Sequence, residues 1–89
     1  MMIEKIGAAA MLEQMAEESA ELAKAALKLA RIIRKENPTP VKEDDAIANL
    51  YEEYTDVVQC GRELNLRPDE DQILVKEARF KKRCKESHK

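Results

Sequence analysis

The feature that most limits the fold of this chain is a proline-containing break between two long helical patterns. From about residue 8 to residue 35, Ala, Leu and Met recur at the three- and four-residue spacings of one helix face. Pro38 and Pro40 then end the pattern, because proline lacks a backbone N–H and pushes the residue before it toward extended geometry. A second helical pattern runs from about residue 43 to residue 64, so we expect an antiparallel helical hairpin.

Shorter helical patterns lie on either side of this hairpin. The opening segment "MMIEKIG" predicts about one helical turn that ends at Gly7. After the connector "NLRP", Asp69 with Gln72 three residues later resembles a capping box and predicts a third helix to about residue 85. His88 lies in a tail that we expect to fray. No strand pattern is apparent, so the expected fold is all-α: a helical hairpin plus a third helix.

Size and composition restrict the class of protein further. The 89 residues predict a single domain, 1–89, that is marginally stable alone. Cys60 and Cys84 form no CxxC motif and no signal peptide is apparent, which predicts a cytoplasmic location. The apolar runs are too short and too often broken by charge for a membrane span. With 16 basic against 18 acidic residues and 3% aromatics, we expect no nucleic-acid partner.

Acidic side chains border the apolar face of both long helices. At about 100° per residue, Glu18 borders the apolar arc of the first helix, about 20° from Met11 and Leu29, and Glu21 lies one turn further along. Glu53 takes the same position on the second helix, and Asp56 repeats the offset of Glu21. Acids at this border are not required for packing, although acidic pairs also occur on solvated helix faces.

The two acidic pairs are expected to meet in the hairpin. Glu18 and Glu21 lie roughly 21–26 Å before the end of the first helix, and Glu53 and Asp56 roughly 15–20 Å after the start of the second. Carboxylates at a helix seam repel one another unless a cation neutralises them. A ligand set made only of oxygen suits Mg²⁺, with Mn²⁺ as a substitute, better than zinc.

The same segments carry a resemblance to a known family. "EESAEL" followed by "EEYTDV" resembles the E-E-x-x-E … E-E-x-x-D signature of the MazG-like all-α nucleoside triphosphate pyrophosphohydrolases, in particular the short single-domain members of bacteria and phages. The likeness covers most of the chain. Thirty-one residues separate Glu21 from Glu53, which is more than usual, and the excess falls in the proline-containing connector.

This resemblance implies an activity and a set of ligands. The activity is Mg²⁺-dependent hydrolysis of a nucleoside triphosphate or deoxynucleoside triphosphate between its α- and β-phosphates, which yields a monophosphate and pyrophosphate. By position in the motif, the implied metal ligands are Glu18, Glu21, Glu53 and Asp56. Glu17 or Glu52 is a candidate general base that orients the attacking water, although a plain solvated role is the ordinary alternative for each.

Candidate substrate-binding residues follow from charge and position. On the third helix, Lys76, Arg79 and Arg83 fall within about 60° of one another beside an apolar line, and a solvated face is the equal alternative. Lys24 is a weaker candidate, three residues beyond Glu21. Asn49 lies beside Glu53 on the helix surface.

Both long helices have apolar arcs that are too wide for a single partner helix. The first spans about 160°, whereas a helix in a bundle usually needs about 100°. We therefore expect a homodimer or homotetramer in which hairpins pair as a four-helix bundle. The resemblance implies the same, since relatives assemble as dimers or tetramers.

Two alternative functions remain open at this point. The chain could be a non-enzymatic helical interaction module, which would neither bind Mg²⁺ tightly nor gain stability from it. Phosphoribosyl-ATP pyrophosphohydrolase shares the fold and length, but its histidine after the acidic motif has no counterpart in "DVVQCGREL". No motif indicates which base or sugar is preferred.

Overall fold

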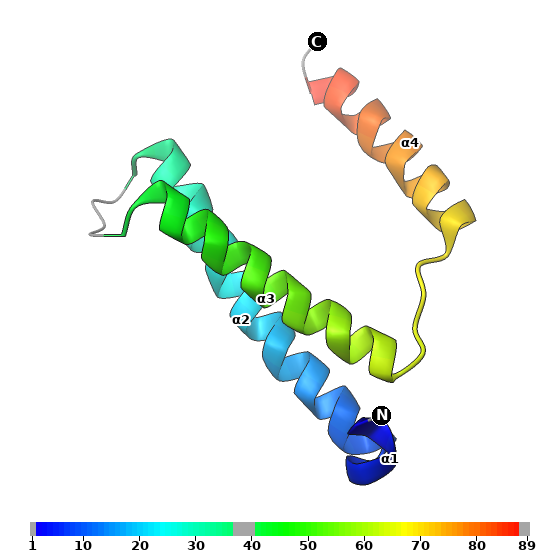
Figure 1. Ribbon diagram of the computed structural model, residues 1–89. Helices are drawn as coiled ribbons and strands as arrows, with labels where there is room; N and C mark the ends of the chain where they lie inside the picture. Colours follow the sequence, from blue (N-terminus) through cyan, green and yellow to red (C-terminus); the bar gives the residue numbers. More distant parts are fainter. Residues whose placement is uncertain (1, 37–40, 88–89) are drawn as a thin grey trace.

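The computed structural model describes residues 2–36 and 41–87, and within these ranges all regular structure is helical (Figure 1). The helices are α1 (Met2–Ile6), α2 (Ala8–Arg34), α3 (Glu43–Glu63) and α4 (Glu70–Ser87). The all-α prediction is confirmed, and each long helix begins and ends within two residues of its expected bounds. The two connector prolines and the C-terminal histidine lie outside the described residues. None of the described helices is both long enough and apolar enough to cross a membrane.

The centre of the fold is the hairpin formed by α2 and α3, which lie side by side and run antiparallel (Figure 1). Among the described residues, the buried side chains are Met11 and Ala25 on α2 and Ala46 and Cys60 on α3. The two alanines let the helix backbones approach closely. Because so few side chains are buried, the hairpin has a thin core, as expected for a chain of 89 residues.

Helix α3 ends in a local hydrogen-bonded motif that fixes the direction of the chain after it. The Asn65 N–H donates to the Arg62 carbonyl oxygen (3.0 Å), and the Leu66 N–H donates to the Gly61 carbonyl oxygen (2.8 Å). This is the Schellman pattern, with Asn65 in the left-handed conformation at φ 58°. Lys35 takes the same conformation at the end of α2, also at φ 58°. Neither residue is glycine, although asparagine is the next most common residue in this left-handed position.

Helix α1 is a single short helix held against the hairpin. Gly7 has φ 86° and ψ 161°, a left-handed conformation that lets the chain turn from α1 into α2. The Ile3 N–H donates to Glu63 Oε2 at 3.4 Å, which ties the start of α1 to the end of α3. The predicted N-terminal turn is thus confirmed.

Helix α4 begins at the expected cap but lies apart from the hairpin (Figure 1). The Gln72 N–H donates to Asp69 Oδ1 at 3.0 Å, so Asp69 caps the helix as predicted. The Gln72 side-chain amide donates to Asp69 Oδ2 at 3.1 Å, whereas a capping box directs this side chain to the backbone N–H of the cap residue. From Glu70 to Glu86 every residue except the half-buried Cys84 is exposed, so α4 adds nothing to the core.

Candidate metal centre

Glu18 and Glu53 occupy the seam between α2 and α3, at positions where a helical hairpin usually has apolar residues. Each buried residue of the described chain lies seven positions from one of these glutamates: Met11 and Ala25 flank Glu18, and Ala46 and Cys60 flank Glu53. Seven residues are about two helical turns, so each glutamate lies on the same face of its helix as its buried neighbours. Both glutamates are half-buried.

Three carboxylates meet at this seam. One oxygen from each of Glu18, Glu53 and Asp56 lies within 4.8 Å of the other two. Oxygen ligands of a Mg²⁺ ion lie about 2.9 Å apart when adjacent and about 4.2 Å apart when opposite, given metal–oxygen distances of about 2.1 Å. Small rotations of the side chains are enough to bring this set around one ion. The residues therefore fit a hard divalent cation in both chemistry and spacing.

The electrostatics of the seam favour a cation. The pKa of Glu53 is raised above its ordinary value, first because the group is partly removed from water and then because of four neighbouring carboxylates. In order of effect, these neighbours are Asp56, Glu52, Glu18 and Glu21. Losing a proton from Glu53 is therefore unfavourable without a compensating positive charge.

Gln14 is a residue of this site that the sequence analysis missed. Its Nε2 donates to Glu18 Oε1 at 2.8 Å, one helical turn before the carboxylate. The hydrogen bond restrains the orientation of the Glu18 carboxylate. The available signal was the spacing of four residues between an amide and a candidate ligand, which places them on the same face of a helix.

Glu21 is the one predicted ligand that lies outside the group of three. Its Oε1 is 3.3 Å from Nζ of Lys24, and both side chains are exposed. Lys24, a predicted substrate-binding residue, thus pairs with a predicted metal ligand. Glu21 nevertheless remains close enough to raise the pKa of Glu53.

The other predicted site residues on the hairpin lie near the carboxylates in the sequence. Glu17 and Glu52 are exposed and directly precede Glu18 and Glu53, about 100° away around each helix. Asn49 is half-buried on α3, one turn before Glu53. These positions leave room for a role in holding water or substrate.

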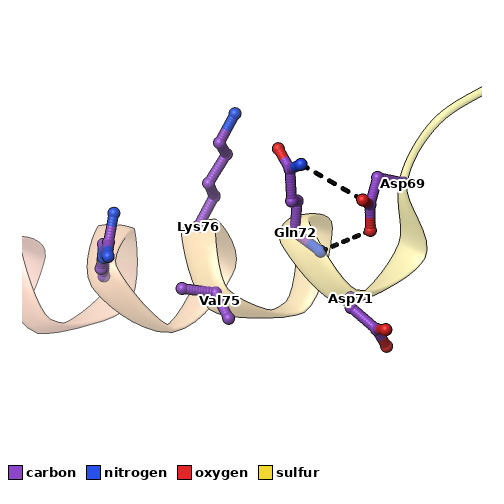
Figure 2. Close-up of a pocket in the computed structure, with 6 residues that line it drawn as sticks. Asp69, Asp71, Gln72, Val75 and Lys76 are labelled. Carbon is purple, nitrogen blue, oxygen red and sulfur yellow. Dashed lines mark hydrogen bonds between the residues drawn. The ribbon is translucent and has the colours of Figure 1, made fainter.

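The predicted phosphate-binding residues on α4 are not brought to the carboxylates. Lys76 and Arg79 line a surface depression beside the Asp69 cap, and Arg83 lies one turn further along the same helix. Figure 2 shows the Lys76 side chain extending from the helix on the same side as Gln72, away from Asp71. Because α4 lies apart from the hairpin, this basic stripe is separated from the seam (Figure 1).

Cys60 lies on α3, one helical turn after Asp56 and two turns after Glu53. Its thiol is free and buried, and its pKa is raised, chiefly by burial and then by the charges of Glu18, Asp56 and Glu63. A thiol in such surroundings stays protonated and is a poor nucleophile. Cys60 therefore serves the packing of the seam.

No protein-family model, curated protein or solved structure matches this chain.

Proposed function

We propose that this chain is a nucleotide pyrophosphohydrolase, a hydrolase acting on the acid anhydride between the α- and β-phosphates of a nucleoside triphosphate. The observation that carries the proposal is the group of three carboxylates at the hairpin seam. Glu18 comes from "EESAEL", and Glu53 and Asp56 come from "EEYTDV". The two half-motifs that resemble the MazG-like signature thus contribute side chains to the same place.

Glu18, Glu53 and Asp56 would hold Mg²⁺, with Mn²⁺ as a substitute and Glu21 as a fourth ligand when it leaves Lys24. When bound, the cation offsets negative charge on the phosphate oxygens and assists the activation of water. Glu17 or Glu52, each adjacent in the sequence to a proposed ligand, orients the attacking water and accepts its proton. Water adds to the α-phosphorus, the bond to the bridging oxygen breaks, and pyrophosphate leaves.

Substrate contacts in this proposal come from both parts of the chain. Lys24 and Asn49 lie beside the carboxylates and are suited to phosphate or sugar oxygens. Lys76, Arg79 and Arg83 supply the positive charge that a triphosphate needs, provided that α4 packs onto a hairpin. A homodimer or homotetramer is part of the proposal, because the hairpin alone leaves wide apolar surfaces exposed.

Pyrophosphate release tests the proposal directly. The full chain is incubated with each of the common ribo- and deoxyribonucleoside triphosphates, with Mg²⁺ or with EDTA. We expect Mg²⁺-dependent release from at least one substrate, in equal amounts with the monophosphate. Glu18→Gln, Glu53→Gln and Asp56→Asn should each reduce turnover at least about 100-fold, which corresponds to about 2.7 kcal/mol of transition-state stabilisation.

Glu13→Gln is the matched control, since Glu13 is an exposed acid on α2 outside the carboxylate group. It should retain wild-type turnover. If the folded wild-type chain releases no pyrophosphate from any of these substrates, the proposed function is wrong. If the wild-type chain is active and all three site variants remain fully active, the assignment of the site residues is wrong.

A helical interaction module is the second candidate. The observation that favours it is the exposure of large apolar side chains, such as Tyr51 at 70% and Phe80 at 65%. Such a module should show no thermal stabilisation by Mg²⁺ and no release of pyrophosphate. The two candidates therefore give opposite results in the same assays.

A further inference from the structure

The folded chain exposes much more surface than a compact monomer of its mass. Its accessible surface is 7609 Å², whereas about 5300 Å² is expected for 10.2 kDa. Its radius of gyration is 16.8 Å, against about 12 Å for a compact domain of this length. The excess of about 2300 Å² is comparable with the roughly 1000–2500 Å² that each copy buries in a permanent homodimer.

Part of this excess is an apolar surface on α3. We define the α3 apolar face as Ile47, Leu50, Tyr51 and Tyr54, which together line one surface depression. Ile47 is 36% exposed, Tyr51 70% and Tyr54 58%. These residues lie at three- and four-residue spacings, so they form one continuous stripe that no described part of the chain covers.

A second part is the apolar line of α4. It consists of Ile73, Phe80 and Cys84, spaced by seven and four residues on one face of the helix. Ile73 is 43% exposed and Phe80 is 65% exposed. Most of the stability of an amphipathic helix in a protein comes from packing its apolar face, so a surface that covers this face would stabilise α4.

The charges of the two surfaces are complementary. Helix α3 carries seven acidic residues and one basic residue, whereas residues 76–85 of α4 carry six basic residues and one acidic residue. Opposite charges beside two apolar faces favour their association and set its orientation. Both surfaces belong to this chain, which indicates a partner identical to itself.

The connector between α3 and α4 argues against packing within one copy. Its start is fixed by the two hydrogen bonds of Asn65 and Leu66, and its end by the Asp69 cap. Pro68 has a restricted φ angle, and it disfavours helical geometry at the preceding Arg67. With both ends fixed and a stiff centre, the chain leaves the hairpin and carries α4 away from its own α3 (Figure 1).

We propose that α4 of one copy packs on the α3 apolar face of a second copy, and that the second copy returns the same contact. The product is a two-fold symmetric dimer held by exchanged helices. Ile73 and Phe80 enter the stripe of Ile47, Tyr51 and Tyr54, and the basic residues of α4 lie along the acids of α3. This architecture goes beyond the hydrolase proposal and does not depend on it.

Light scattering coupled to size exclusion, in EDTA and without nucleotide, gives the first test. At micromolar concentration the wild-type chain should have twice the monomer mass of 10.2 kDa. The variant Ile73→Asp/Phe80→Asp should have the monomer mass and should lose at most the helix content of α4, because both side chains are exposed within one copy and lie outside the α2–α3 hairpin. Leu74→Asp is the matched control: Leu74 is also 65% exposed but lies off the apolar line, so this variant should remain dimeric.

Mixing two defective full-length variants distinguishes exchange from packing within a copy. Tyr51→Asp/Tyr54→Asp damages the α3 apolar face and leaves α4 intact, whereas Ile73→Asp/Phe80→Asp does the reverse. Each should be monomeric alone, and a mixture should form a heterodimer through its one intact contact. If Tyr51→Asp/Tyr54→Asp loses the helix content of the hairpin, Tyr51→Ser/Tyr54→Ser takes its place in the same mixture.

A wild-type chain that stays monomeric, or a mixture of folded variants that stays monomeric while wild type dimerises, overturns the helix exchange. The mass of the wild-type chain and the mass of the mixture are both measured without metal or substrate, so they do not depend on the outcome of the pyrophosphate assay. A dimer without hydrolysis would reject the hydrolase activity and leave the exchange standing. Hydrolysis by a monomer would reject the exchange, and with it the oligomer of the hydrolase proposal, and leave the activity standing.

Discussion

Glu18 of α2 and Glu53 of α3 lie opposite each other in the hairpin seam, with carboxylate oxygens within 4.8 Å. Two turns away in either direction along each helix, the equivalent positions are buried. A sequence optimised only for packing would have apolar residues at both sites. Acids at both positions cost packing stability, and the proposed metal site gives a reason for that cost.

Glu53→Gln should raise the unfolding temperature of the metal-free chain by a few degrees. The substitution keeps the shape of the side chain and removes a charge that burial and four neighbouring carboxylates disfavour. Thermal unfolding followed by circular dichroism in EDTA measures the effect. The same variant should lose most of the stabilisation that Mg²⁺ gives to wild type.

Glu13→Gln again provides the comparison, because Glu13 is exposed and does not contribute to the shift at Glu53. Its unfolding temperature should match wild type in EDTA and in Mg²⁺. If both variants raised the unfolding temperature equally, the total charge of the chain, and not repulsion among the carboxylates at the seam, would control stability.

The stability of the metal-free chain should fall as pH rises from acid toward neutral. A carboxyl group whose pKa is raised by folding, as for Glu53, gives its full stability below the unfolded value near 4.5. That stability is lost as pH rises through the folded pKa, because the folded state must then give up a proton that it holds more tightly than the unfolded state. Urea unfolding across this range should show a steeper decline for wild type than for Glu53→Gln. Parallel pH profiles would contradict the prediction.

Gln14→Ala should weaken Mg²⁺ binding roughly 10-fold, the lower end of the usual effect of residues that orient a metal ligand. The cause is the loss of the hydrogen bond from Gln14 to Glu18. Calorimetric titration with Mg²⁺ or Mn²⁺ measures it. Gln59→Ala removes a similar hydrogen bond within one helix, from Gln59 to Glu63 (3.4 Å), away from the group of three, and should leave the affinity unchanged. If both variants bind alike, Gln14 has no positioning role.

Cys60 should react slowly with a thiol reagent at mildly alkaline pH. Burial and the neighbouring carboxylates raise its pKa, so little thiolate is present, and the sulfur is shielded. The Cys84→Ser variant leaves Cys60 as its only thiol, and its rate is compared in buffer and in denaturant. An equal rate under both conditions would show that the seam around Cys60 is open.

Much of the hairpin could be predicted from the sequence, because its signals are local and periodic. The spacing of apolar residues sets α2 and α3, and the acids at residues 43–45 mark the start of α3. The sequence indicates the two seam glutamates as candidate site residues, because packing does not require an acid at the border of an apolar face. The pairing of Glu18 with Glu53 followed from counting turns in an antiparallel hairpin.

Other parts depend on contacts that no local pattern reports. Glu21 has the spacing of a ligand, yet a lysine one turn away pairs with it. The left-handed Asn65 is set by the hydrogen bonds of the helix end, and it directs α4 away from the hairpin. The amphipathic pattern of α4 predicts a helix with one apolar face, but it does not identify the surface that this face packs against.

Ala25 and Ala46 lie two turns from Glu18 and Glu53, toward the loop that joins the helices, and both are almost fully buried. In the proposed metal site, small side chains at these positions would influence which ion fits, because the distance between the two helix backbones limits how far apart the carboxylates lie. Oxygen ligands stand about 2.0–2.1 Å from Mg²⁺ and about 2.3–2.6 Å from Ca²⁺. A larger residue at either alanine would wedge the helices apart, widen the opening between the glutamates and shift the preference of the site toward the bigger ion.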